Sequence, residues 1–229
     1  MTGSSAQLER QALFEIPFWQ IELPEILPFH AEMIDEVEQS IDRTRDANTN
    51  EVFLADQTVE DPFDGRSEGW SLLDARMAEA YREIISSSFQ RWRSGELHLR
   101  RWAIRLGRLD AESKKKLRTT GIHNHLPALF SSIYYLSVPD EMVDDEDGGT
   151  VFYQPLGNQL DLIAPRMRTI APREGRLVVF PAFLDHAPVP VDWDARGKSR
   201  IVISSDIFYV SGKGAGPHSD TVSVAGGGA

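Results

Sequence analysis

The sequence contains no cysteine, so neither disulfides nor thiolate metal sites are available to this chain of 229 residues. Any bound metal must therefore be held by nitrogen and oxygen ligands. Long apolar runs are also absent, and none approaches the roughly 18 residues that a membrane span requires. The N-terminus lacks the basic start and apolar stretch of a signal peptide. We therefore expect a cytoplasmic protein that does not contact membranes.

Positive charge is scarce as well. Asp and Glu number 35 against 24 Lys and Arg, which gives a formal net charge of −11. Binding to nucleic acid needs a basic face, so this balance argues against a nucleic-acid partner. The hydrophobic share of 41% and the charged share of 26% are ordinary for a globular protein. The composition leaves the oligomeric state open.

The domain organisation follows from where apolar residues recur. We expect a single domain over residues 13–210, made of a supporting part at 13–95 and a β-rich core at 96–210. The segments 1–12 and 211–229 have little to bury, and the second is rich in Gly and Ser. Such segments are expected to be flexible tails.

Apolar spacing predicts the elements of the supporting part. Alternation predicts a strand at 13–23, and helical spacing predicts helices at about 26–43 and 74–92, with a loop at 56–70 between them. From residue 96 onwards, short apolar runs broken by turn signals are typical of antiparallel strands. The expected fold class is mainly β (α+β), with two helices packed outside a barrel or sandwich.

Two of the six histidines, His123 and His125, lie one residue apart in "TTGIHNHLPALFSSIYYLSVP". Residues i and i+2 of a strand face the same side, so both imidazoles could reach one metal ion. An H-x-H pair alone is a weak signal, because two polar residues near a loop are common. His186 strengthens it, since it follows an apolar strand and a turn in "GRLVVFPAFLDHAPVPV", from which a third ligand could come.

Arg200 opens a strand-like run, "RIVISSDIFYV", in which alternation places Val202, Ser204 and Asp206 on the same face. An arginine inside such a run is costly to bury unless it meets an anion. A bidentate carboxylate would be a suitable partner. The residues leave a second possibility open, in which Arg200 lies exposed at the strand start and pairs with an aspartate of "VDWDARG".

In their order along the chain, the segments HNH, IYYLS, GGTVFYQP, GRLVVFP…H and R-x-x-x-S resemble the iron(II)- and 2-oxoglutarate-dependent oxygenases. They are most similar to a bacterial and phage subfamily with an HNH segment. The resemblance covers residues 96–209, and its specificity lies in the ordered set. It implies a double-stranded β-helix (jelly-roll, cupin-like) core, with Fe(II), 2-oxoglutarate and O2 as cofactor and cosubstrates.

The resemblance also implies roles for individual residues. His123 and His186 would be the iron-binding histidines, and Arg200 would form the salt bridge to the distal carboxylate of 2-oxoglutarate. The expected cosubstrate-binding residues are Arg200, Tyr135, Ser131 and Ser204. Gly148 and Gly149 would form the tight turn before the next strand.

The sequence departs from the family pattern at His125, where most members place Asp or Glu. His125 could complete a three-histidine iron site, in which case His123, His125 and His186 are the metal and catalytic residues. It could instead lie behind two iron-binding histidines, or the site could prefer another divalent metal. A neutral imidazole in place of a carboxylate makes the site one unit more positive and favours an anionic cosubstrate.

The expected function is Fe(II)- and 2-oxoglutarate-dependent hydroxylation of an unactivated C–H bond in a small molecule or peptide. One alternative is a three-histidine dioxygenase that binds its substrate directly to iron and does not use 2-oxoglutarate. Another is a cupin-like binding module without turnover. The links at 107–120 and 138–148 could act as lids over the site.

Overall fold

The computed structural model describes nine stretches of the chain, which are residues 15–48, 55–57, 67–88, 96–106, 121–142, 148–155, 166–189, 198–210 and 220–223. The predicted N-terminal tail, 1–12, lies outside these stretches. So do the link at 107–120, residues 143–147 and most of the predicted C-terminal tail. The expectation that the links at 107–120 and 138–148 act as lids therefore stays a prediction.

The N-terminal strand is shorter than the sequence predicts. The expected strand at 13–23 is confined to β1 (Trp19–Glu22), and a 3-10 helix, η1 (Pro24–Phe29), follows it. Helix α1 (His30–Asn48) begins after η1, whereas the sequence predicts a helix from 26 to 43. Pro28 in η1 explains the difference, because a proline disfavours the α-helical conformation of the residue before it, here Leu27.

The second helix begins earlier than predicted. The sequence predicts a loop at 56–70 and a helix at 74–92, but α2 spans Glu68–Ser88. The Ser67 carbonyl accepts the backbone N–H groups of Trp70 and Ser71 and so starts the first turn. Glu68 in that turn complements the positive end of the helix dipole. Within the predicted loop, a short strand, β2 (Ala55–Gln57), pairs with the core.

The β-rich part forms two antiparallel sheets. In the larger sheet the strands run in the order β1-β7-β4-β9-β3-β10, with β2 also on β3, and the smaller sheet has the order β6-β5-β8. Their bounds are β3 (Glu96–Leu106), β4 (Phe130–Ser137), β5 (Thr150–Tyr153), β6 (Met167–Ile170), β7 (Arg176–Pro181), β8 (His186–Pro188), β9 (Arg200–Val210) and β10 (Asp220–Ser223). A short 3-10 helix, η3 (Asp140–Met142), follows β4. β10 lies within the segment 211–229 that the sequence predicts as a loose tail, and it pairs with β3.

The register of β9 fixes which of its side chains share a face. Arg200 pairs with Leu106 of β3, and Asp206 pairs with Arg100 of β3 and with Ser131 of β4. Directly paired residues of neighbouring strands point to the same side of a sheet. Arg200 and Asp206 therefore project from the same face, near opposite ends of β9.

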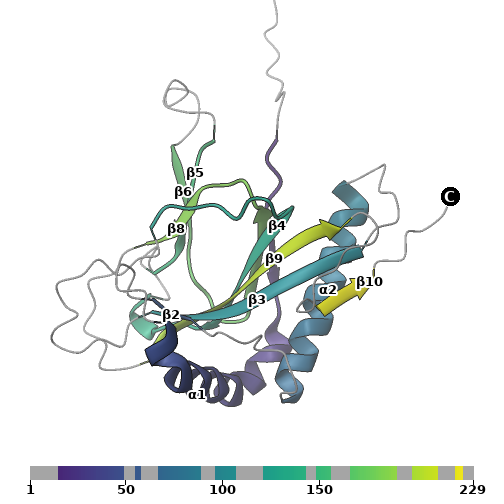
Figure 1. The fold of residues 1–229 in the computed structure, drawn as a ribbon. Helices are drawn as coiled ribbons and strands as arrows, with labels where there is room; N and C mark the ends of the chain where they lie inside the picture. Colours follow the sequence, from purple (N-terminus) through teal and green to yellow (C-terminus); the bar gives the residue numbers. More distant parts are fainter. Residues whose placement is uncertain are drawn as a thin grey trace, which may run out of the picture.

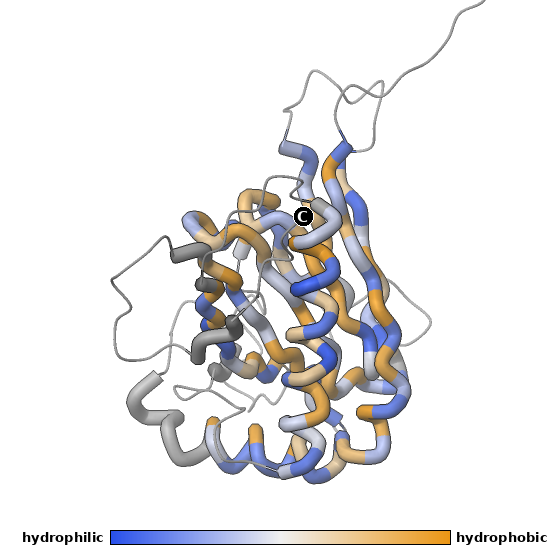
Figure 2. Tube along the Cα trace, turned by 90° about the vertical axis from the view of Figure 1, so that its right-hand side faces the viewer, coloured by the Kyte–Doolittle hydropathy of each residue, from blue (hydrophilic) through white to orange (hydrophobic). Residues whose placement is uncertain are grey.

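The two faces of the larger sheet are covered differently (Figure 1). Helices α1 and α2 cover one face, and β5, β6 and β8 lie over the other. One hydrophobic cluster joins the helices to the first face, and a second fills the space between the two sheets. Orange and blue residues interleave along the helices and strands in Figure 2, as expected for elements with one buried side. The predicted mainly β fold with external helices is confirmed.

Two buried side chains between the helices and the sheet make polar contacts. Trp70 is only 1% exposed, and its indole N–H donates to Glu36, so it anchors α2 in the core. His30 is buried and shares a 2.8 Å hydrogen bond with the Tyr134 hydroxyl. Neither helix in the described part of the chain is apolar enough over a sufficient length to cross a membrane.

Candidate metal and 2-oxoglutarate site

Backbone pairing brings the three candidate metal ligands together. His123 donates its backbone N–H to the His186 carbonyl at 3.0 Å, and His186 returns the bond at 2.9 Å. The backbone N–H of His125 donates to the Ala182 carbonyl at 2.9 Å. This isolated antiparallel bridge joins the H-x-H segment to the start of β8. It explains how residues about sixty positions apart in the sequence come to share one site.

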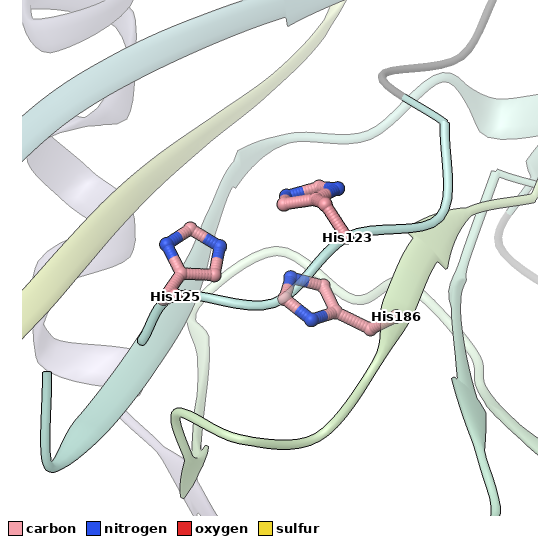
Figure 3. Close-up of side chains that lie close together, drawn as sticks. All are labelled: His123, His125 and His186. Carbon is pink, nitrogen blue, oxygen red and sulfur yellow. The ribbon is translucent and has the colours of Figure 1, made fainter. Parts of the chain in front are cut away.

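The three imidazoles face a common point. One ligand atom from each of His123, His125 and His186 lies within 4.8 Å of the others. The ring centroids are 4.6 Å apart for His123 and His186, and 5.0 Å apart for each of the other two pairs. Figure 3 shows the three rings side by side, two from the same segment and one from β8. Three clustered imidazoles suit a divalent transition metal.

In all three histidines the ring nitrogen Nδ1 faces a hydrogen-bond acceptor. The Nδ1 atom of His123 lies 2.9 Å from the Gly121 carbonyl, and that of His186 lies 3.0 Å from the Leu184 carbonyl. Because a carbonyl only accepts, both Nδ1 atoms carry the proton. The Nδ1 atom of His125 meets a carboxylate instead. In each case Nε2 keeps its lone pair for a metal, which is how proteins commonly orient metal-binding histidines.

Asp206 is the carboxylate behind His125. Its Oδ1 atom lies 2.9 Å from His125 Nδ1 and also accepts a 2.6 Å hydrogen bond from the Ser131 hydroxyl. The side chain is buried, with 5% of the residue exposed. The sequence placed Asp206 only on the face of Arg200 and gave it no role. The family pattern has a carboxylate at position 125, so in this chain an acidic group lies one hydrogen bond behind that position.

Burial keeps two of the three imidazoles neutral. Desolvation, with smaller contributions from the nearby His123 and His125, lowers the pKa of His186 from 6.5 to about 3. Desolvation likewise lowers the pKa of His123. Only a neutral imidazole has a lone pair to give to a metal. The environment of the cluster therefore favours the protonation state that metal binding needs.

A cavity of about 360 Å³ opens over the histidines. Its walls come from β3, β4, β7, β8 and β9, from the start of β5 and from the segment 123–125. The predicted residues that line it are His123, His125, His186, Ser131, Arg200 and Ser204. Apolar side chains, among them Ile104, Ile133 and Phe180, fill the wall between the polar groups. A few polar groups in an apolar wall are typical of a small-molecule site.

Arg200 is buried at one end of this cavity. Only 3% of the residue is exposed, so the possibility of an exposed arginine at the strand start is wrong. Its Nε–H donates to the Gly148 carbonyl, and its guanidinium carbon lies 5.4 Å from the centre of the Tyr135 ring. Among the described residues no carboxylate lies within ion-pair distance of Arg200. Burial lowers the pKa of this guanidinium, but arginine starts so high that it remains charged.

Tyr135 lies beside Arg200 but does not itself line the cavity. Its hydroxyl shares a 2.8 Å hydrogen bond with the Thr150 hydroxyl. Thr150 does line the cavity. Sequence reasoning missed Thr150, although it stands directly after the two glycines of the turn. Gly148 has a φ of 70°, which confirms the positive φ expected there.

The segment that holds the site matches a known protein family. Residues 111–206 match a protein family described as 2OG-Fe(II) oxygenase, where 2OG is 2-oxoglutarate. The match includes all three clustered histidines and Arg200. Over these residues the chain is similar to the 2OG-Fe(II) oxygenases. The predicted enzyme class and its cofactors, Fe(II) and 2-oxoglutarate, are those of this family. A search of curated protein sequences finds no match.

Solved structures support the oxygenase fold. A prolyl-4-hydroxylase from Pseudomonas putida is similar, with a TM-score of 0.56 and 15% identity over 86% of this chain and 94% of that chain. The epimerase SnoN in complex with Fe3+ and alpha ketoglutarate has a TM-score of 0.50 and 17% identity, over 91% of both chains. HygX from Streptomyces hygroscopicus, with nickel and 2-oxoglutarate bound, has a TM-score of 0.50 and 11% identity, over 84% and 83%. At these identities the likeness shows the fold, a double-stranded β-helix.

The low pKa of His186 makes the stability of the metal-free oxygenase depend on pH. The unfolded chain takes up this proton near pH 6.5, but the folded chain takes it up only near 3. Between these values the unfolded state binds more protons, so the free energy of unfolding falls as pH falls. We expect the free energy of unfolding to fall more steeply with decreasing pH in wild type than in His186→Gln. The difference in slope is expected to reach up to about 1.4 kcal/mol per pH unit. Urea unfolding of both proteins between pH 3 and 6.5 measures these slopes. Equal slopes would contradict the buried environment of His186.

Proposed function

We propose that this oxygenase hydroxylates an unactivated C–H bond of a small molecule or peptide, with Fe(II) held by His123, His125 and His186. The observation that carries the proposal is the shared orientation of the three rings. Each Nδ1 proton is donated to a fixed acceptor, so each Nε2 lone pair is free for one metal. Three protein ligands leave open positions for a cosubstrate and dioxygen.

Arg200 is the proposed anchor for 2-oxoglutarate. Its Nε–H is already used by Gly148, so the N–H groups of its two terminal nitrogens remain for a carboxylate. The lack of an ion-pair partner among the described residues supports this role, because a buried guanidinium needs an anion. The Thr150 hydroxyl, held by Tyr135, is a further polar group on the cavity wall.

The residues around the site control solvent and charge. When bound, Fe(II) supplies the activation of dioxygen, and the overall reaction converts 2-oxoglutarate, O2 and the substrate into succinate, CO2 and a hydroxylated product. The apolar wall formed by Ile104, Ile133 and Phe180 limits water near the reacting groups. Asp206 fixes the tautomer of His125 and places a negative charge behind a ligand set that has none of its own.

The proposed role of Asp206 leads to a specific expectation. Asp206→Asn keeps an oxygen that can accept from His125 but removes the charge. We expect its affinity for Fe(II) to fall by about 10–100-fold. Anaerobic competition against a chromogenic chelator measures this affinity. Asp140→Asn is the matched control, because Asp140 is exposed in η3 and contacts none of the three histidines. Wild-type affinity in Asp206→Asn would refute the role.

Turnover in the absence of a prime substrate tests the proposed function. We expect oxygen uptake that requires both Fe(II) and 2-oxoglutarate and yields succinate in equal amount, and no uptake in His186→Ala. Oxygen uptake that proceeds without 2-oxoglutarate and forms no succinate would favour the three-histidine dioxygenase. Fe(II) binding without oxygen uptake, under any cosubstrate, would favour a binding module.

A further inference from the structure

A second arginine lines the cavity at the end away from Arg200. On β3, Leu106 pairs with Arg200, whereas Arg100 lies six residues earlier and pairs with Asp206. Both arginines line the same cavity, but Arg200 is buried and Arg100 is exposed. The proposed 2-oxoglutarate site uses only Arg200. It gives no role to Arg100.

Arg100 belongs to a ladder of side chains that leads to the metal cluster. Its guanidinium carbon lies 5.4 Å from the centre of the Trp102 ring. The Trp102 ring in turn stacks on His125, with a centroid distance of 5.8 Å and an interplanar angle of 25°. Trp102 is half-buried and lines the cavity. The guanidinium is therefore two ring contacts away from a proposed metal ligand.

The charge of Arg100 is available to a ligand. Among the described residues no carboxylate lies within ion-pair distance of it, although the chain carries a net charge of −11. Its cross-strand neighbour, Asp206, is instead bound to His125 and Ser131. An exposed cation at the edge of a cavity can exchange water for an anion at low cost, whereas a buried one cannot stay unpaired. This difference suits Arg200 to a cosubstrate and Arg100 to a substrate.

We propose that the substrate of this oxygenase carries a carboxylate next to an aromatic or other flat group, and that Arg100 and Trp102 bind these two parts. The inference rests on the proposed function and deepens it. A planar guanidinium fits a carboxylate through two parallel hydrogen bonds, and the indole face suits a flat group. A single arginine close to Asp206 favours a singly charged carboxylate over a doubly charged phosphate. The substrate carbon beyond the flat group then lies toward the three histidines.

The test compares two probes that differ in charge. The protein is loaded with Zn(II), which three histidines also bind, and saturated with 2-oxoglutarate so that Arg200 is occupied. Calorimetry then measures binding of 3-phenylpropanoate and of its neutral counterpart, 3-phenylpropanamide. We expect wild type to prefer the acid by about 10-fold, the scale of a hydrogen-bonded charge pair, and to lose the preference as salt rises.

Three variants show which residues cause the preference for the acid over the amide. Arg100→Gln is expected to bind acid and amide alike, and Trp102→Leu is expected to weaken both by a similar factor. Arg82→Gln, an exposed arginine on α2, is the matched control and should behave as wild type. The proposal is overturned if wild type fails to bind the acid or binds both probes equally, or if Arg100→Gln keeps the preference.

The same samples separate this proposal from the proposed function. Titration with 2-oxoglutarate precedes the probes, and Arg100→Gln is expected to bind it as wild type does. Failure of wild type to bind 2-oxoglutarate would reject the cosubstrate site. A normal 2-oxoglutarate titration without a preference for the acid would reject only the substrate site.

Discussion

Replacing Arg200 by glutamine is expected to raise the dissociation constant of 2-oxoglutarate by about 100-fold or more, the cost of removing one partner of a buried charge pair. Metal binding should stay near the wild-type level, because Arg200 contacts Gly148 and Tyr135 but none of the three histidines. Arg200→Lys should also bind 2-oxoglutarate poorly. Its point charge lacks the planar fork that holds both carboxylate oxygens.

Calorimetric titration of 2-oxoglutarate into Zn(II)-loaded protein measures this loss. Arg173→Gln serves as the control, because Arg173 is exposed in the turn before β7. Arg200 is buried, so a variant could bind weakly because its fold has loosened. The rise in melting temperature caused by metal alone resolves this, since it depends on the folded metal site. Wild-type affinity for 2-oxoglutarate in a folded Arg200→Gln protein would exclude Arg200 as the anchor.

Replacing His125 by alanine is expected to lower the affinity for Fe(II) by more than replacing Asp206 does. Loss of a residue that only supports a ligand costs about 10–100-fold. The change removes one of three nitrogens and also leaves the buried Asp206 carboxylate with Ser131 but without its histidine partner. Chelator competition, as for Asp206→Asn, gives the affinity. A fall of only about twofold would mean that His125 does not bind the metal.

A carboxylate at position 125 gives a sharper comparison. His125→Asp recreates the His-x-Asp pattern, but it sets the new carboxylate beside Asp206, which is already buried. Two like charges at close range oppose each other. We therefore expect His125→Asp with Asp206→Asn to bind Fe(II) more tightly than His125→Asp alone. Equal affinities would contradict the proposed charge relation between the two positions.

The fold was largely predictable because its signals are local. Alternation and turn residues predicted the strands beyond residue 96, and helical spacing predicted two helices. The errors lie at element ends. Pro24 and Pro28 form a 3-10 turn where the sequence predicted α-helix, and Ser67 starts α2 inside a predicted loop. β10 was missed because its pairing with β3 depends on a distant strand, not on its own residues.

The site was predictable where the residue types are chemically distinctive. Three histidines at fixed places in an ordered pattern were sufficient to predict the cluster, whereas the residues alone left the burial of Arg200 open. Asp206 and Thr150 were missed because their roles depend on cross-strand contacts. Asp206 reaches His125 only because β4 and β9 pair in this register, and Thr150 lies next to Tyr135 only in the folded chain.

The central claim is that the three histidines hold Fe(II) and that 2-oxoglutarate binds beside it. The most direct measurement is an anaerobic titration of the Fe(II)-loaded protein with 2-oxoglutarate, followed by visible absorption. A weak metal-to-ligand charge-transfer band is expected in wild type when the cosubstrate chelates the iron, and no band is expected in His186→Ala. Wild-type protein that binds Fe(II) but shows no band at saturating 2-oxoglutarate would contradict the account.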